Sequence, residues 1–330
     1  MRCAVVGGGA WGTALADLLA RNGHESMLWA RESDVVEGIN RRHENARFLA
    51  GAPLAPSLRA TDDLEDAVAG AELITYAAPS HVLRHVAAQT AGAVPESATV
   101  AVATKGIERD TFALMTDVIG DELPGRQVVA LSGPSFAAEV AARQPTAVVA
   151  ASSAAAAAGV VQRAYSSPAF RVYTHDDVTG VELGGALKNV MAVASGMVEG
   201  LGLGFNSRAA LITRGLAEMT RLGVALGAKQ ATFAGLAGMG DLVLTCTGAL
   251  SRNRAVGVEI GKGRTLDEVL EGKETVAEGV LNTQSAHALS ARQGIEMPIV
   301  AAVHRILFEN RPAREAMVDL MERELRAEQD

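Results

Sequence analysis

Short apolar segments alternate with helical segments through the first half of the chain. The apolar segments have the length of buried strands and lie at residues 3–6, 26–29, 73–77, 99–103, 128–131 and 146–150. Between them, segments such as 82–89 and 112–123 have helical character. Regular alternation of this kind predicts an α/β fold with a Rossmann-type, doubly wound parallel sheet.

The second half of the chain has a different pattern. Long helical stretches occupy residues 180–200, 208–226, 266–270 and 276–292. We therefore expect two domains, a dinucleotide-binding Rossmann domain over residues 1–180 and an all-α substrate and catalytic domain over residues 181–330. The alanine tract at 154–158 is low in complexity, but alanine has the highest helix propensity, so a helix is expected there rather than a linker.

A G-x-G-x-x-G motif follows the first predicted strand, with its glycines at positions 7, 9 and 12. Gly7 permits a tight turn, Gly9 lets the backbone approach a pyrophosphate, and Gly12 lets the next helix pack closely on the strand. The start of that helix offers unpaired N–H groups to an anion. Because a strand precedes the motif and an amphipathic helix follows it, the motif predicts a dinucleotide site.

Arg31 stands at the tip of the second strand, where an Asp or Glu would hold the ribose 2′-hydroxyl of NAD. A guanidinium group matches the oxygens of a 2′-phosphate in a two-pronged geometry. We therefore predict a preference for NADP(H), with NAD(H) as the alternative. For NAD(H), the Glu32 side chain would turn inward toward the cofactor and the Arg31 side chain would point into solvent.

Composition and charge narrow the class of protein. The 48% hydrophobic content is ample for sizeable cores, and the net charge of -8 argues against a surface for nucleic acid or anionic membranes. The chain has two cysteines, no apolar run of membrane-spanning length and no signal peptide before the first strand. We expect a cytoplasmic protein without membrane insertion. The seven histidines have no metal-ligand spacing, so no metal is expected.

Polar residues follow three of the predicted strands, at 78–81, 104–108 and 132–137. The carboxyl ends of parallel strands meet at one edge of a sheet, where ligands bind, so these three segments are expected to form one rim. Lys188 lies in the second half and interrupts a helix of small apolar residues. A desolvated lysine has a depressed pKa suited to proton transfer, whereas the alternative is a lysine whose ammonium group reaches solvent.

Seven segments together resemble the bacterial NAD(P)-dependent glycerol-3-phosphate dehydrogenases. They are GGGAWGTALA at 7–16, TKGIE at 104–108, SGPSFA at 132–137, GALKN at 185–189, GDL at 240–242, SRNR at 251–254 and VAEG at 276–279. The match runs in the family's order over nearly the whole chain. It implies reduction of dihydroxyacetone phosphate to sn-glycerol 3-phosphate, a precursor of glycerophospholipids.

The resemblance implies roles for individual residues. Lys188 matches the family's proton donor and acceptor, and Lys105 and Asp241 are assigned with it as the catalytic residues. Substrate binding is assigned to Lys105, Gly133, Ser135, Lys188, Asp241, Ser251, Arg252 and Asn253. Cofactor binding is assigned, from the glycine motif, the strand tip and the resemblance together, to Gly7, Gly9, Ala10, Trp11, Gly12, Arg31, Lys105, Ala137, Arg252, Val276 and Glu278. The family often has Ser where this chain has Ala10, so backbone N–H groups would have to replace one hydroxyl contact to the pyrophosphate.

The segment Ser251-Arg252-Asn253 matches the family's phosphate clamp. Ser is a good helix N-cap, so the segment would bring helix-end N–H groups and a guanidinium around one phosphate. The alternative is an exposed polar helix start. Asp241 is expected to orient Lys188, with Thr245 one helical turn further on the same face.

Two other functions share part of these features. Another two-domain reductase, acting on a 3-hydroxyacid or ketopantoate, would keep the glycine motif but would not need the clamp. A non-catalytic dinucleotide sensor would not need Lys188 and Asp241 together.

Cys246 could serve as the nucleophile of a sugar-nucleotide dehydrogenase, but that role needs a thiolate, and a buried thiol is expected instead. The sequence leaves the oligomeric state open, with a homodimer as one expectation.

Overall fold

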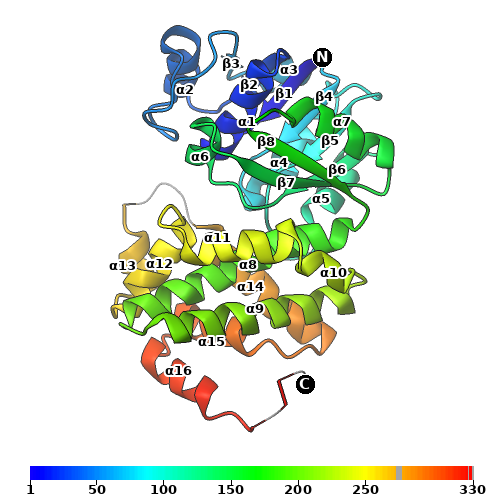
Figure 1. The fold of residues 1–330 in the computed structure, drawn as a ribbon. Helices are drawn as coiled ribbons and strands as arrows, with labels where there is room; N and C mark the ends of the chain where they lie inside the picture. Colours follow the sequence, from blue (N-terminus) through cyan, green and yellow to red (C-terminus); the bar gives the residue numbers. More distant parts are fainter. Residues whose placement is uncertain (273–276, 326, 329–330) are drawn as a thin grey trace.

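The computed structural model describes residues 1–272, 277–325 and 327–328. Its first half contains a sheet of eight strands in the order β3-β2-β1-β4-β5-β6-β7-β8 (Figure 1). The strands are β1 (Arg2–Val6), β2 (Glu25–Trp29), β3 (Arg59–Thr61), β4 (Leu73–Tyr76), β5 (Thr99–Val102), β6 (Gln127–Ser132), β7 (Thr146–Ala151) and β8 (Phe170–His175). All neighbouring pairs are parallel except β6 and β7, so the predicted Rossmann-type architecture is confirmed.

Helices cover both faces of this sheet. They are α1 (Ala10–Arg21), α2 (Ser33–Glu37), α3 (Leu64–Val68), α4 (Leu83–Thr90), α5 (Met115–Glu122), α6 (Ala137–Ala141) and α7 (Ala155–Tyr165). Cys3 and Val5 of β1 join one core with α1 and α7, whereas Ala4 and Val6 join a second core with α4 and α5. Successive side chains of a strand point to opposite faces, so β1 is buried on both of its faces.

The strand pattern did not reveal the direction of β7, which runs antiparallel to β6. The expectation of a wholly parallel sheet is therefore wrong at this strand. The connection holds only the five-residue α6, which rises about 7 Å, whereas β6 is about 20 Å long. So short a helix does not carry the chain back to the start of a parallel strand.

Three other local expectations differ from the structure. Strands β3 and β8 were not predicted, because three residues are too few to show a period and β8 lacks the continuous apolar run by which the other strands were recognised. Helix α5 begins at Met115 rather than at residue 112. Phe112 has a φ of 61°, which is a left-handed conformation that an α-helix does not contain.

The second half is helical, as predicted. Its α-helices are α8 (Val178–Gly200), α9 (Phe205–Ala225), α10 (Gln230–Phe233), α11 (Asp241–Thr247), α12 (Arg252–Gly261), α13 (Leu266–Leu270), α14 (Glu278–Gln293), α15 (Pro298–Phe308) and α16 (Ala313–Met321). Figure 1 shows these helices stacked beneath the sheet, with α8 near the middle of the molecule. Among the described residues, no single helix could cross a membrane, although the bent pair Gln230–Thr247 and Arg252–Gly261 passes by length and composition.

Helix α8 connects the two halves. It follows β8 after two residues, and the side chain of Asp177 caps it by accepting a hydrogen bond from the backbone N–H of Gly180. The domain boundary that we predict after residue 180 falls in the first turn of α8 and remains a prediction. Residues 180–197 of this helix are buried around its whole circumference, and this burial places Lys188 in the interior.

Candidate functional site

The glycine motif forms the predicted turn between β1 and α1. Gly7 has a φ of 132°, and a Cβ there would lie 2.8 Å from the backbone of Ala77. A Cβ on Gly12 would overlap the carbonyl oxygen of Gly7, so this position requires the smallest residue. At Gly9, by contrast, a Cβ would meet none of the described atoms within 4 Å. The turn is therefore tight on its protein side and open at Gly9.

The start of α1 has the features that an anion site needs. Gly9 is the N-cap, and none of the described side chains caps the helix, so its first N–H groups lack an intrahelical or side-chain acceptor there. Ala10 is the first helical residue. The buried Nε1 of Trp11 has no hydrogen-bond partner within the described part of the chain. These donors and the open space at Gly9 fit the pyrophosphate of a dinucleotide.

Arg31 lies just beyond β2, and its side chain is 82% exposed. Its Nη2 donates to Oε1 of Glu32 at 2.9 Å. A 2′-phosphate at this strand tip would have to compete with the Glu32 carboxylate for the guanidinium group. Arg31, which would favour NADP(H), and Glu32, which would favour NAD(H), are therefore hydrogen-bonded to each other.

Two lysines meet on one buried aspartate. Lys188 of α8 is 7% exposed, and its Nζ lies 3.0 Å from Oδ1 of Asp241 at the start of α11. Lys105 lies just beyond β5, and its Nζ donates to the other carboxylate oxygen, Oδ2, at 2.6 Å. The structure thus brings together the three residues predicted to be catalytic, from positions far apart in the sequence.

This arrangement changes the acidity of both Lys188 and Asp241. Burial lowers the pKa of Lys188 to about 8, and the Asp241 carboxylate offsets part of this effect. Burial alone would raise the pKa of Asp241, but the two ammonium groups hold it below its usual value. Lys188 Nζ also donates to Oγ1 of Thr245 at 2.8 Å, and this hydroxyl donates to the backbone oxygen of Asp241. Thr245 therefore shares the face of α11 that was predicted for it.

The three polar segments after β4, β5 and β6 lie together at one edge of the sheet, as predicted. The Thr104 hydroxyl donates to the backbone oxygen of Ala78 at 2.6 Å. Lys105 Nζ and Ser135 Oγ both donate to the backbone oxygen of Gly133, each at 3.0 Å. Residues from the second and third segments thus converge on the same carbonyl oxygen beside Asp241.

The segment predicted as a phosphate clamp begins α12. Ser251 is its N-cap and accepts a hydrogen bond from the backbone N–H of Arg254, as predicted. Arg252 is the first helical residue and is exposed. The Asn253 amide donates to Oδ1 of Asn189 at 2.9 Å and accepts from the backbone N–H of Gly279 at 2.8 Å. Asn253 therefore connects α12 to α8 and α14, a role that the sequence did not reveal.

Glu278, at the start of α14, contacts the other half of the molecule. Its carboxylate accepts hydrogen bonds from the backbone N–H of Ser80 at 3.0 Å and from the Ser80 hydroxyl at 2.6 Å. Burial raises the pKa of Glu278, and the hydrogen bonds from Ser80 and the charges of His81 and Arg252 offset part of this effect. Ser80 belongs to the first polar segment, but its partner could not be identified from the sequence. Val276, also predicted to bind the cofactor, lies outside the described residues.

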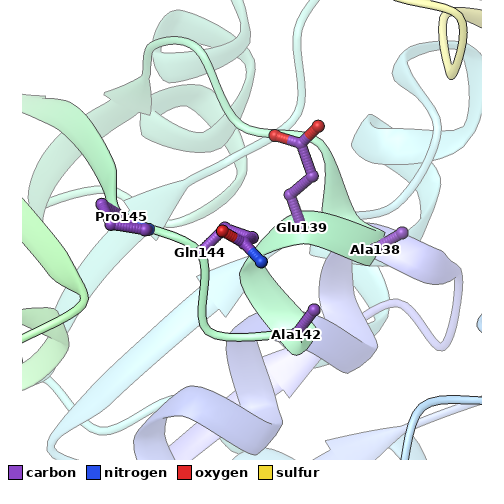
Figure 2. Close-up of a pocket in the computed structure, with 5 residues that line it drawn as sticks. All are labelled: Ala138, Glu139, Ala142, Gln144 and Pro145. Atoms are coloured by element: carbon purple, nitrogen blue, oxygen red, sulfur yellow. The ribbon is translucent and has the colours of Figure 1, made fainter.

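The Cys246 thiol and a surface hollow take no part in the proposed chemistry. Burial raises the pKa of the Cys246 thiol to about 12, so the thiolate needed for nucleophilic chemistry does not form near neutral pH. A shallow hollow beside α6 is lined by Ala138, Glu139, Ala142, Gln144 and Pro145 (Figure 2). It adjoins Ala137 but includes none of the predicted site residues. Within the described residues, no cluster of His, Cys, Asp and Glu could hold a metal ion.

Comparison with known proteins identifies similar proteins along the whole chain. Residues 2–158 and 177–318 match the sequence models of the NAD-dependent glycerol-3-phosphate dehydrogenase N-terminus and C-terminus. The glycerol-3-phosphate dehydrogenase (NAD(P)+) of Geobacter sp. (strain M21) is 53% identical over 330 residues, covering 99% of this chain and 98% of that protein. The crystal structure of glycerol-3-phosphate dehydrogenase from Coxiella burnetii has a TM-score of 0.93 at 42% identity, over 98% of this chain and 99% of that one.

One of the rival reductase classes is similar in fold only. A ketopantoate reductase of Ralstonia eutropha JMP134 has a TM-score of 0.62 at 17% identity, over 98% of this chain and 100% of that one. At this identity the similarity shows a shared fold and carries no argument about substrate.

Proposed function

This chain belongs to the NAD-dependent glycerol-3-phosphate dehydrogenase family, and from that membership we propose how its residues divide the work of the reaction. The reaction is the reduction of dihydroxyacetone phosphate to sn-glycerol 3-phosphate with NAD(P)H. Lys188 handles the proton, Lys105 and Asp241 set its position and charge, and Arg252 holds the phosphate. The observation that carries this proposal is the buried Lys188–Asp241–Lys105 cluster at the carboxyl edge of the sheet.

The proton step follows from the charge that develops on the substrate. A bound nicotinamide cofactor supplies the hydride that the carbonyl carbon accepts. As the carbonyl oxygen gains negative charge, the Lys188 ammonium group both stabilises that charge and donates a proton to it. Asp241 holds the ammonium group in place, and its second oxygen is occupied by Lys105. In the reverse reaction the neutral Lys188 amine accepts the proton of the hydroxyl group.

Phosphate binding by the start of α12 follows from its chemistry. Arg252 carries a guanidinium group at a helix N-terminus, and both the charge and the nearby N–H groups attract an anion. Asn253 fixes this helix end to Asn189, the residue after Lys188. The distance between the phosphate site and the proton donor is therefore set by a direct hydrogen bond between α12 and α8.

A single assay tests the proposed function. NADPH oxidation is followed with dihydroxyacetone phosphate, with unphosphorylated dihydroxyacetone, with ketopantoate, and without a ketone. We expect rapid oxidation only with the phosphorylated triose, and product analysis should identify sn-glycerol 3-phosphate. Faster oxidation with ketopantoate, or no oxidation with any ketone, would overturn the proposal in favour of one of the two rival functions.

The pKa of Lys188 predicts how the rate depends on pH. Reduction needs the protonated ammonium group, so kcat/KM should fall as the pH rises through about 8. Oxidation of glycerol 3-phosphate needs the neutral amine, so its kcat/KM should rise through the same range. Both profiles are to be measured from about pH 7 upward, above the second ionisation of the substrate phosphate at about pH 6. Parallel profiles in the two directions would contradict the role of Lys188.

We propose that Arg31 reads the 2′-phosphate and gives a preference for NADPH. Arg31→Ala should weaken NADPH binding by about one to two orders of magnitude and leave NADH binding unchanged. Glu32→Gln is the matched variant, because it removes the carboxylate that competes for the guanidinium group, and it should strengthen NADPH binding. Both dissociation constants are measured by cofactor fluorescence. An equal loss for the two cofactors in Arg31→Ala would exclude this role.

We also propose that the enzyme acts in the cytoplasm as a homodimer and supplies glycerophospholipid synthesis. Both cysteines are free and buried, which suits a reducing compartment. Phe205 is 84% exposed and Leu250 is 52% exposed, and a dimer contact over either side chain would remove apolar surface from water. Light scattering of the purified protein measures its molar mass and tests the dimer directly.

A further inference from the structure

Asn282 of α14 forms hydrogen bonds to both chain segments that carry the catalytic lysines of the proposed mechanism. We propose that Asn282 is a positioning residue that holds the segment 104–108, here called the lysine loop, against α8, so that Lys105 and Lys188 meet on Asp241. The proposal rests on the proposed function, because it concerns the same two lysines. It assigns a task to a side chain that the sequence analysis did not single out.

The contacts of Asn282 join the two lysine-bearing segments. Its Oδ1 accepts a hydrogen bond from the backbone N–H of Ile107 at 3.4 Å, and its Nδ2 donates to the backbone oxygen of Ala186 at 3.3 Å. Ile107 is two residues after Lys105, and Ala186 is two residues before Lys188. Asn282 has no exposed surface, so its two hydrogen bonds are shielded from bulk water.

The lysine loop is tied to the sheet half by other residues. Thr104 donates to the backbone oxygen of Ala78 on the neighbouring segment. Glu108 accepts two hydrogen bonds from Arg84 of α4, at 2.9 and 2.8 Å. These contacts hold both ends of the loop to the sheet but not to α8. Ile107 also packs in the hydrophobic core that contains Ala186 and Leu187 of α8. Removing Asn282 would therefore leave the loop folded and near α8 but without the hydrogen bonds that fix its position relative to Lys188.

Helix α14 is well held where it carries Asn282. Glu278 binds Ser80 of the sheet half, and the backbone N–H of Gly279 binds Asn253 of α12. Thr283 is also fully buried, and within the described residues its hydroxyl bonds only to the backbone oxygen of Gly279 in the same helix. Thr283 is therefore a matched control, since it is adjacent and buried but has no hydrogen bond to either lysine segment.

The charges around Lys188 give the proposal a distinctive readout. The titratable groups that face Lys188 are Asp241 and Cys246 of α11 and Lys105 of the lysine loop. The positive charge of Lys105 lowers the pKa of Lys188. If the loop moves away, Lys188 loses this repulsion and no longer shares Asp241, so its pKa rises. A loss of folding stability alone would not raise the pKa of Lys188.

The test uses Asn282→Ala in the full-length enzyme. We expect kcat for dihydroxyacetone phosphate reduction to fall about 10- to 100-fold, because a displacement of about 1 Å costs on this order. We also expect the pH at which the reduction rate declines to move to a higher value. Asn282→Leu keeps the volume of the side chain and serves the same test if the alanine variant does not fold. Thr283→Val should leave both kcat and the pH profile near those of the wild type.

A double-mutant cycle with Lys105→Met shows whether Asn282 acts through the lysine loop. In the Lys105→Met background, the additional effect of replacing Asn282 should be less than about threefold. An unchanged pH profile in the single variant, or an equal loss of kcat in both backgrounds, would overturn the proposal. Failure of the proposed function is a separate outcome, in which Lys188→Ala itself retains turnover.

Discussion

Lys188→Ala should fold and bind NADPH but lose about two to four orders of magnitude in kcat for dihydroxyacetone phosphate reduction, the usual effect of removing a positioned acid. The carbonyl oxygen would then gain its negative charge beside a cavity rather than beside an ammonium group. Asp241 would remain close by and would disfavour that charge. Single-turnover measurements of NADPH oxidation separate this chemical step from product release.

Two controls distinguish catalysis from stability in this experiment. Lys188→Met keeps most of the side-chain volume in the buried helix and should show the same loss of kcat as the alanine variant. A small primary amine added to Lys188→Ala should restore part of the rate, since the cavity can admit a replacement proton donor. Turnover within tenfold of the wild type in both variants would remove Lys188 from the mechanism.

Arg252→Ala should raise KM for dihydroxyacetone phosphate far more than it affects unphosphorylated dihydroxyacetone. A charged hydrogen bond contributes roughly 1.5–3 kcal/mol, so the ratio of kcat/KM for the two ketones should fall about ten- to hundred-fold. Binding energy from the phosphate also positions the carbonyl group, so kcat should fall too. Because Arg252 is itself a predicted cofactor contact, NADPH affinity is measured separately.

Arg264→Ala is the matched control for this variant. It removes an equal charge just beyond the far end of α12, where Arg264 pairs with Glu259. It should leave the ratio for the two ketones unchanged. Arg252→Lys keeps the charge but not the forked geometry and should give an intermediate ratio. An unchanged ratio in Arg252→Ala would contradict the phosphate clamp.

Local features of the fold could be predicted from the sequence because their physical causes are local. The glycine motif was recognisable from its spacing, and the contact of Gly12 with the carbonyl oxygen of Gly7 is local, whereas the space needed at Gly7 is set by Ala77 beyond β4. The small apolar residues around Lys188 left both a buried and a solvent-reaching lysine open, and the structure buries it. The N-cap at Ser251 required only the chemistry of a hydroxyl beside a helix start.

Roles for Lys105, Lys188 and Asp241 could be inferred only because their motifs resemble those of a known family. Periodicity does not report that residues 136 positions apart, Lys105 and Asp241, share a hydrogen bond. Such a contact depends on how complete helices pack, and many sequences with the same local pattern are compatible with other packings.

By itself the sequence determined the alternating sheet half, the helical half and the dinucleotide turn, because each is encoded in neighbouring residues. Only the tertiary structure decided the reversal of β7, the contact between Glu278 and Ser80, and the position of Asn282 between the lysine segments. Asn282 reads from sequence as an ordinary polar residue in a helix. Its partners, Ile107 and Ala186, contribute backbone groups that every residue possesses, so no side-chain pattern could reveal them.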